Sequence, residues 1–129
     1  MSRLRLFDLF YPAVATFADT TAGGSETFIA VGALSLDETA EISVHAGHAP
    51  NFLLFDEQGH LRRIIPNPYV NLHEDTAHKV ADFLAEHNVR LMIAGDFGPH
   101  VAKALDDKGI RHVKDMGLAN IAVRSLNPK

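Results

Sequence analysis

Two histidines that lie three residues apart are the residues of this chain best suited, by type and spacing, to bind a metal. His45 and His48 enclose Ala46 and Gly47, and the apolar, strand-like run 52–55 follows within a few residues. Small residues between the histidines let the backbone turn tightly, so both imidazoles can share one target. The chain contains no cysteine, so ligation of a soft or borderline metal relies on imidazole first and on carboxylate second. The spacing therefore indicates a metal or metal-cluster site in this loop.

A second candidate region lies where another apolar run turns into a helix. Gly95 and Gly98 bracket the turn, Pro99 suits the first helical position, and His100 lies in the first helical turn. Unpaired backbone N–H groups at such a helix start favour an anion. We therefore expect Gly95, Gly98 and His100 to contribute to binding an anionic cluster or an organic acid of a cofactor. The alternative is that the glycines only form a tight turn.

The remaining five histidines are weaker candidates. His73 and His78 are five residues apart around a helix start, and that spacing does not place them on one helix face. We expect His78 to face solvent, and whether His73 and His78 join the site stays open. His60 is expected in a hairpin turn, and His87 and His112 at the surface near the ends of elements.

The elements that must position these residues form an α/β layer structure with a mixed sheet. Gly59 separates two apolar runs, which indicates a hairpin and antiparallel strands. Later apolar runs alternate with residues at helical spacing, which predicts parallel neighbours. Asn71 is expected to cap the first helix, with Glu74 as its capping-box partner. The expected order is strands at 27–34, 41–45, 52–56 and 61–65, a helix with Ala77, Val80, Ala81 and Leu84 buried, a strand at 89–94, a helix from Pro99 to a glycine stop at Gly109, a strand at 110–113, and a closing helix with Leu118, Ile121, Ala122 and Leu126 on one face.

Composition predicts one globular domain with an appendage. The 129 residues are 47% hydrophobic and 22% charged, close to the globular average. Residues 1–26 are expected to form an extension and linker, and 27–129 the domain. The net charge of -4 argues against nucleic acid as a partner, and no run approaches the ~20 apolar residues of a membrane span. The lack of cysteine fits a reducing compartment, so the cytoplasm is the expected location.

Enzymatic alternatives find little support in the residues. No G-x-S-x-G elbow and no cysteine nucleophile are present. Asp56 and Asp96 both follow strand-like runs and could pair around magnesium, but two acids without a third, in a chain with no basic groove, argue against a nuclease. A hydrolase with a metal held by histidine and Asp96 stays open as an alternative.

Three sequence blocks resemble the dinitrogenase iron-molybdenum cofactor biosynthesis family. They are H-A-G-H-A-P-N-F-L-L-F-D at 45–56, K-V-A-D-F-L-A-E-H-N-V at 79–89 and I-A-G-D-F-G-P-H-V-A-K-A-L at 93–105. Family members typically read H-F-G-R-A-x-x-F, then A-x-x-G-V, then I-A-G-x-I-G-P, and the likeness covers roughly residues 27–126. Ala46 replaces the usual phenylalanine and His48 the usual arginine.

The resemblance implies a ribonuclease-H-like, three-layer fold in which about three helices flank the sheet. It also implies a role in binding, storing or carrying a metal cluster, such as the iron-molybdenum cofactor, a precursor or a related iron-sulfur species, without catalysis. The histidine of the family's H-F-G motif, thought to ligate the cluster, corresponds to His45, and Gly47 also matches. The smaller Ala46 opens space beside His45, and the imidazole of His48 adds a possible ligand in place of a fixed positive charge.

Two hypotheses from different classes result. In the first, the chain binds a metal cluster or a transition metal ion with His45 as primary ligand and His48 and His100 as secondary ligands, and it exchanges this cargo with cofactor-assembly or acceptor proteins. In the second, the chain is a small regulatory or adaptor domain that binds a partner protein through apolar side chains of residues 1–26, and the histidines have no part in its function.

Overall fold

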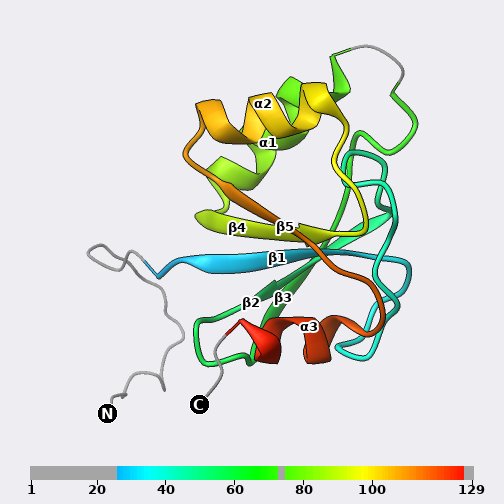
Figure 1. The fold of residues 1–129 in the computed structure, drawn as a ribbon, viewed down its shortest axis with the longest axis vertical. Helices are drawn as coiled ribbons and strands as arrows, with labels where there is room; N and C mark the ends of the chain where they lie inside the picture. The colour runs from blue at the N-terminus through cyan, green and yellow to red at the C-terminus, as the bar shows by residue number, and fades with distance from the viewer. Residues whose placement is uncertain (1–25, 73–74, 127–129) are drawn as a thin grey trace.

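The computed structural model describes residues 26–72 and 75–126. These residues form a five-stranded mixed sheet in the order β3-β2-β1-β4-β5, with helices on both faces (Figure 1). β1 pairs antiparallel with β2, and β2 with β3, whereas β4 is parallel to β1 and to β5. This order confirms the ribonuclease-H-like, three-layer α/β fold predicted from the sequence. The strands are β1 (Phe28–Ala33), β2 (Asn51–Phe55), β3 (Leu61–Pro66), β4 (Val89–Ala94) and β5 (Arg111–Lys114).

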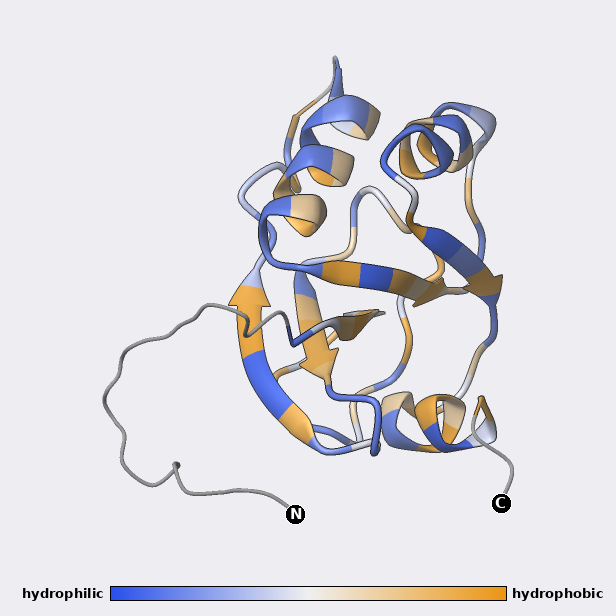
Figure 2. Cartoon of the chain, turned by 90° about the vertical axis from the view of Figure 1, so that its left-hand side faces the viewer, coloured by the Kyte–Doolittle hydropathy of each residue, from blue (hydrophilic) through white to orange (hydrophobic). Residues whose placement is uncertain are grey.

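The central strands bury residues on both faces because helices cover both sides of the sheet. Alternate residues of β1 and β2 point to opposite sides. Ala30, Phe52 and Leu54 pack in the cluster under α1 (Thr76–Glu86) and α2 (Pro99–Asp107). The intervening residues, such as Val31 and Leu53, pack in the cluster under α3 (Ala119–Ser125). In Figure 2 the helices carry both hydrophilic and hydrophobic residues, which is typical of amphipathic helices that cover a sheet.

Three local expectations were wrong. Residues 41–45 form isolated bridges, Ala33 with Ile42 and His45 with Asp96 among them, instead of a strand, because this segment leaves β1 and crosses toward β4. α1 begins at Thr76 after Asp75, not after Asn71, and Glu74 lies outside the described residues. In α3, Ala122 is buried and Leu126 packs against the same cluster, as expected, but Leu118 and Ile121 are exposed and Ala119 and Val123 are buried instead.

Other turn signals are confirmed. Gly59 and Gly109 have φ values of 90° and 72°, which a residue with a side chain rarely adopts. Gly59 lies in the β2–β3 hairpin, and Gly109 follows the C-cap of α2. Pro99 is in the first turn of α2, as expected.

An ion pair joins the side of α1 to the end of α2. Nζ of Lys108 lies 2.9 Å from Oδ1 of Asp82. This hydrogen bond holds the pKa of Asp82 below its usual 3.8 and raises the pKa of Lys108 above its usual 10.5. The pair therefore helps to hold together the two helices that frame the candidate site.

The Asp82–Lys108 pair should give stability a defined pH window. On the acid side, the stabilisation is present above the ordinary pKa of Asp82 and is lost as the pH falls through the lowered pKa of Asp82. On the alkaline side, the stabilisation is present below the ordinary pKa of Lys108 and is lost as the pH rises through the raised pKa of Lys108. Asp82→Asn should therefore lower the thermal unfolding midpoint slightly at neutral pH and not at pH extremes. Thermal scans across pH check this, and Lys108→Met should add nothing to the effect of Asp82→Asn. A deficit that persists in strong acid would contradict the assignment.

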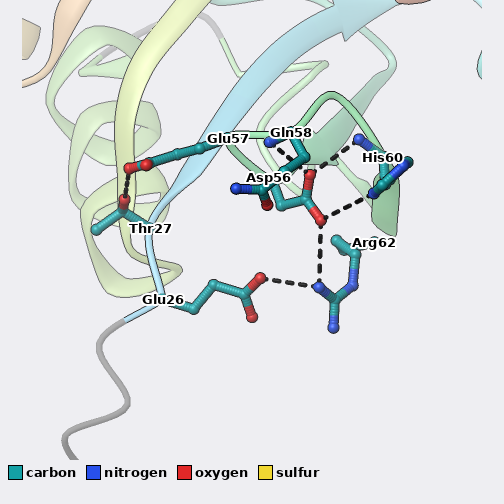
Figure 3. Close-up of polar contacts among 7 residues, drawn as sticks. All are labelled: Glu26, Thr27, Asp56, Glu57, Gln58, His60 and Arg62. Atoms are coloured by element: carbon teal, nitrogen blue, oxygen red, sulfur yellow. Dashed lines mark hydrogen bonds and ion pairs between the residues drawn. The ribbon is translucent and has the colours of Figure 1, made fainter. Parts of the chain in front are cut away.

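The carboxylate of Asp56 closes the β2–β3 hairpin (Figure 3). It is 4% exposed, and its Oδ1 accepts the backbone N–H groups of Gln58 and His60, each at 2.9 Å. Its Oδ2 accepts a hydrogen bond from Arg62 at 3.3 Å, and Arg62 also pairs with Glu26 at 2.9 Å. A buried carboxylate needs such partners, so Asp56 has a structural role here.

Asp56 and Asp96 lie at opposite ends of the central strands, and this separation rules out the magnesium pair considered from the sequence. Because β2 is antiparallel to β1, Asp56 lies near the start of β1, where Ile29 pairs with Phe55. Because β4 is parallel to β1, Asp96 lies past the other end. The six residues of β1 separate them by about 20 Å at the usual rise per residue.

Residues 1–25 lie outside the described residues, and so does the expected extension and linker apart from Glu26. None of the helices in 26–72 and 75–126 has the length and apolar composition needed to cross a membrane.

Candidate functional site

A hollow of about 750 Å³ opens at the carboxyl ends of β1 and β4, where the first turns of α1 and α2 meet the loop before β2. In open α/β sheets ligands bind beside the carboxyl ends of the strands. The lining combines imidazoles, carboxylates, a lysine and small residues: His45, Ala46, Gly47, His48, Asp75, Thr76, Ala77, His78, Asp96, Gly98, Pro99, His100, Val101, Lys103, Ala104 and Asp107.

Backbone hydrogen bonds attach the histidine loop to the end of β4. The N–H of Asp96 donates to the carbonyl of Val44 at 2.6 Å, and the N–H of Ala46 donates to the carbonyl of Asp96 at 3.2 Å. The N–H of Gly95 donates to the carbonyl of Ser43 at 2.9 Å. These bonds extend the sheet by one short parallel bridge, so His45 emerges beside Asp96.

Asn67 holds the other side of the same loop. Its side-chain amide donates to the carbonyls of Gly47 at 3.1 Å and Ala49 at 2.9 Å, and its Oδ1 accepts the N–H of Tyr69. The residue is 4% exposed. Two carbonyls of the histidine loop therefore depend on one buried side chain for their hydrogen bonds.

A hydrogen bond orients the ring of His48. Its Nδ1 lies 3.2 Å from the carbonyl of Val70. A carbonyl can only accept, so this contact requires the proton on Nδ1, and in the neutral ring the lone pair is then on Nε2. Metal-ligating histidines are commonly oriented in this way.

Gly47 passes close to the first turns of both helices. A Cβ at this position would lie 3.3 Å from Cγ2 of Val101 and 3.7 Å from Cγ2 of Thr76. The small residue expected from the sequence therefore has a packing reason: it lets the loop sit against α1 and α2 and brings His45 and His48 to the helix starts.

Gly95 and Gly98 have different roles. A Cβ on Gly95 would collide with Sδ of Met116 and would lie 2.8 Å from Cα of Val44, so this glycine allows two segments to close over the end of β4. Gly98 is the N-cap of α2 with φ -64°, and a Cβ on this residue would have no neighbouring atom within 4 Å. Neither position needs the backbone freedom of glycine, and only Gly95 is required by packing.

The charges around the hollow are largely paired. Nζ of Lys114 lies 3.2 Å from Oδ1 of Asp96, and this hydrogen bond, with that of the Phe97 N–H, lowers the pKa of Asp96. Asp96 is therefore ionised at neutral pH with its charge shared by a lysine. Nζ of Lys103 lies 3.4 Å from Oδ2 of Asp107.

The structure brings the three predicted histidine ligands, His45, His48 and His100, to the rim of one hollow, and His78 joins them. His78 is exposed, as expected, but it faces this rim from the first turn of α1. His73 lies outside the described residues. Within 26–72 and 75–126, no three histidine, aspartate or glutamate side chains are grouped closely enough to hold a metal ion.

Sequence reasoning missed Asn67 and Asp75. The signal for Asn67 was its position between two prolines, Pro66 and Pro68, which restrict the backbone on both sides and leave the side chain to make the local hydrogen bonds. Asp75 precedes α1 with φ 59° and lines the hollow. The sequence contains no clear signal for Asp75, because the helix start was expected four residues earlier.

Comparisons with known proteins agree with this fold. The family described as dinitrogenase iron-molybdenum cofactor matches residues 28–125. The apo orange protein from Desulfovibrio gigas is 22% identical, with a TM-score of 0.73 over 78% of this chain and 87% of that one. A putative NifB protein from Thermotoga is 21% identical, with a TM-score of 0.64 over 78% and 89%. No curated protein matched the chain.

Proposed function

The chain belongs to the dinitrogenase iron-molybdenum cofactor family, and on this premise we propose that it binds, stores or carries a metal cluster in the hollow without catalysing a reaction. The cargo is the iron-molybdenum cofactor, a precursor or a related iron-sulfur or molybdenum species. His45 is the primary ligand, and His48 and His100 are secondary ligands.

The observation that carries the proposal is the convergence of histidines from distant segments on one hollow. His45 and His48 come from the loop before β2, and His100 comes from the first turn of α2. Separate elements of the fold therefore present imidazoles to the same space, which a chance pair of neighbouring histidines would not do. Imidazole is a suitable ligand for iron and other transition metals.

The arrangement suits a cluster better than a single ion. One ion needs its ligands within about 2 Å of a common point, and the described residues contain no such group of three. A cluster presents several metal and sulfide atoms across its surface, so separated imidazoles can each contact a different atom. A volume of about 750 Å³ has room for such a guest.

The start of α2 adds a second kind of contact. The N–H groups of His100 and Val101 lie in the first turn of α2, where the helix offers them no acceptor, so they face the open end of the helix. These groups and the helix dipole favour negative charge, such as the sulfides of an anionic cluster or the carboxylates of an organic acid. Gly98 lines the hollow beside them. The proposed partners are proteins that assemble the cofactor or accept it.

The proposal predicts a histidine-dependent and pH-dependent retention of metal. Full-length protein is incubated anaerobically with isolated iron-molybdenum cofactor, or with iron and sulfide, and metal per chain is measured after gel filtration. His45→Ala should lose most of the metal and His48→Ala or His100→Ala part of it. Retention should fall in acid, because ligation needs neutral imidazole.

His60→Ala is the matched control. His60 is exposed in the β2–β3 hairpin, at the opposite end of the strands from the hollow. This variant should retain as much metal as the unaltered chain. Equal retention by His45→Ala and His60→Ala, or no retention of any of these metals by the unaltered chain, would contradict the proposal.

A further inference from the structure

Exposed apolar side chains gather on one part of the described surface. Of its seven exposed large hydrophobic residues, all but Ile64 come from two segments, 34–44 and 115–121. Such residues are common singly, but a contiguous group marks an interaction site. We call this group the docking face; its members, 42% to 62% exposed, are Leu34, Leu36, Val44, Met116, Leu118 and Ile121.

Backbone hydrogen bonds show that the two segments lie side by side. The N–H of Ile42 donates to the carbonyl of Gly117, and Glu41 bridges Leu118. The N–H of Leu34 donates to the carbonyl of Glu41. Leu34 and Leu118 therefore flank Glu41 across three adjacent stretches of chain. Ile121 is one helical turn beyond Leu118 at the start of α3, below the sheet in Figure 1.

The docking face continues to the rim of the hollow. Val44 precedes His45, and its carbonyl accepts the N–H of Asp96. Met116 lies against Gly95 at the end of β4. A protein seated on the docking face would thus contact the same loop that carries the proposed primary ligand.

The charges of the two segments indicate the chemistry of the partner. Segments 34–44 and 115–121 contain four carboxylates and no lysine or arginine: Asp37, Glu38, Glu41 and Asp115. Next to segment 115–121 in the sequence, Lys114 pairs with Asp96 and Arg124 lies in the last turn of α3. Because Glu41 lies between Leu34 and Leu118, the docking face mixes apolar side chains with carboxylates, and this mixture complements a surface that is apolar and basic. A second copy would place the carboxylates of this face near the same carboxylates of its partner, so self-association is disfavoured.

From these observations we propose that the docking face binds another protein whose contact surface combines apolar side chains with lysine or arginine, and that this protein exchanges cargo with the hollow. The exchange rests on the proposed function; the docking does not. The test therefore uses no metal, so a failure of docking and a failure of cargo binding are separate results.

The test titrates ¹⁵N-labelled full-length protein with a synthetic peptide of alternating leucine and arginine, and with a leucine–glutamate peptide of equal length. The leucine–arginine peptide should shift the amides of 34–44 and 115–121 saturably and more weakly at high salt, and the leucine–glutamate peptide should not. Leu118→Asn with Ile121→Asn should weaken binding at least about tenfold, a loss of 1.4 kcal/mol. Glu38→Gln with Glu41→Gln should also weaken it.

Ile64→Asn and Glu86→Gln are the matched controls, an exposed isoleucine on β3 and an exposed glutamate at the end of α1, and both should bind normally. Amide spectra without peptide confirm that each variant is folded. Four results would overturn the proposal: no saturable shift, equal binding of both peptides, self-association that Ile121→Asn abolishes, or a shift of these amides on deleting residues 1–24. The third result would assign the face to a second copy, and the fourth to the chain's own N-terminal residues.

Discussion

Replacing Asn67 with alanine should lower the free energy of unfolding by about 2 to 4 kcal/mol, because the carbonyls of Gly47 and Ala49 lose their hydrogen-bond donor. The side chain is almost fully buried, so water cannot replace it without opening the structure. The same change frees the histidine loop, so metal retention should fall as well. Asn67→Ala thus links the stability of the fold directly to the order of the candidate site.

Chemical denaturation measures the loss. Asn67→Asp tests the cause, because it keeps the shape of the side chain and the acceptor for Tyr69 but removes the donor to the two carbonyls. It should cost at least as much as Asn67→Ala. The control is Asn71→Ala at an exposed position, expected to change stability by no more than about 0.5 kcal/mol. If Asn67→Ala were as mild as Asn71→Ala, the side chain would not be what holds the loop.

Gly95→Ala should destabilise the chain by about 1 to 3 kcal/mol through overpacking. Met116 can move aside, since its side chain is flexible and exposed, but Cα of Val44 belongs to the backbone and lies 2.8 Å from the new Cβ. The segment 43–46 must then move away from the end of β4. That movement lengthens the hydrogen bond between Asp96 and Val44 and shifts His45.

Gly98→Ala is the matched control, three residues away in the same turn. Its surroundings are open and its φ of -64° suits any residue, so stability should change by no more than about 0.5 kcal/mol. Thermal or chemical unfolding of both variants separates the two glycines. Equal losses would mean that the turn needs glycine for its backbone conformation and not for the approach of Val44.

The layer order and most elements could be predicted because they depend on local signals. Gly59, Pro99 and Gly109 each act through backbone geometry that the residue type alone determines. The apolar runs of β1, β2 and β4 reflect burial on both faces of the sheet. The family match over residues 28–125 confirms the resemblance read from the three sequence blocks.

The features that could not be predicted depend on contacts between distant segments. Asn71 has a good capping side chain, but Thr76 Oγ1 bonds to the carbonyl of Leu72 and α1 starts later. Leu118 and Ile121 were expected on the inner face of α3 together with Ala122, yet Ala119 and Val123 join Ala122 there and the two larger residues are exposed. Helical periodicity does not determine which apolar face a short helix buries when small residues pack closer to the sheet.

The sequence indicated the loops that carry His45, His48 and His100, and the structure brings these loops to one hollow, but their assembly could not be predicted. Whether His45 would line the same hollow as His100 depended on the crossing of residues 41–45 toward β4. That crossing is held by backbone hydrogen bonds, which cannot be predicted from the residue types. The same crossing places Val44 and Met116 at the surface beside the hollow. One local feature thus shapes both the proposed cargo site and the docking face.

The most direct test of the account is ¹⁵N NMR of the histidine ring nitrogens before and after anaerobic loading with iron-molybdenum cofactor. The account predicts that the signals of His45, His48 and His100 shift or broaden, while those of His60 and His87, which lie away from the hollow, do not change. Loading that leaves the rings of His45, His48 and His100 unaffected would contradict the claim that these imidazoles hold the cargo.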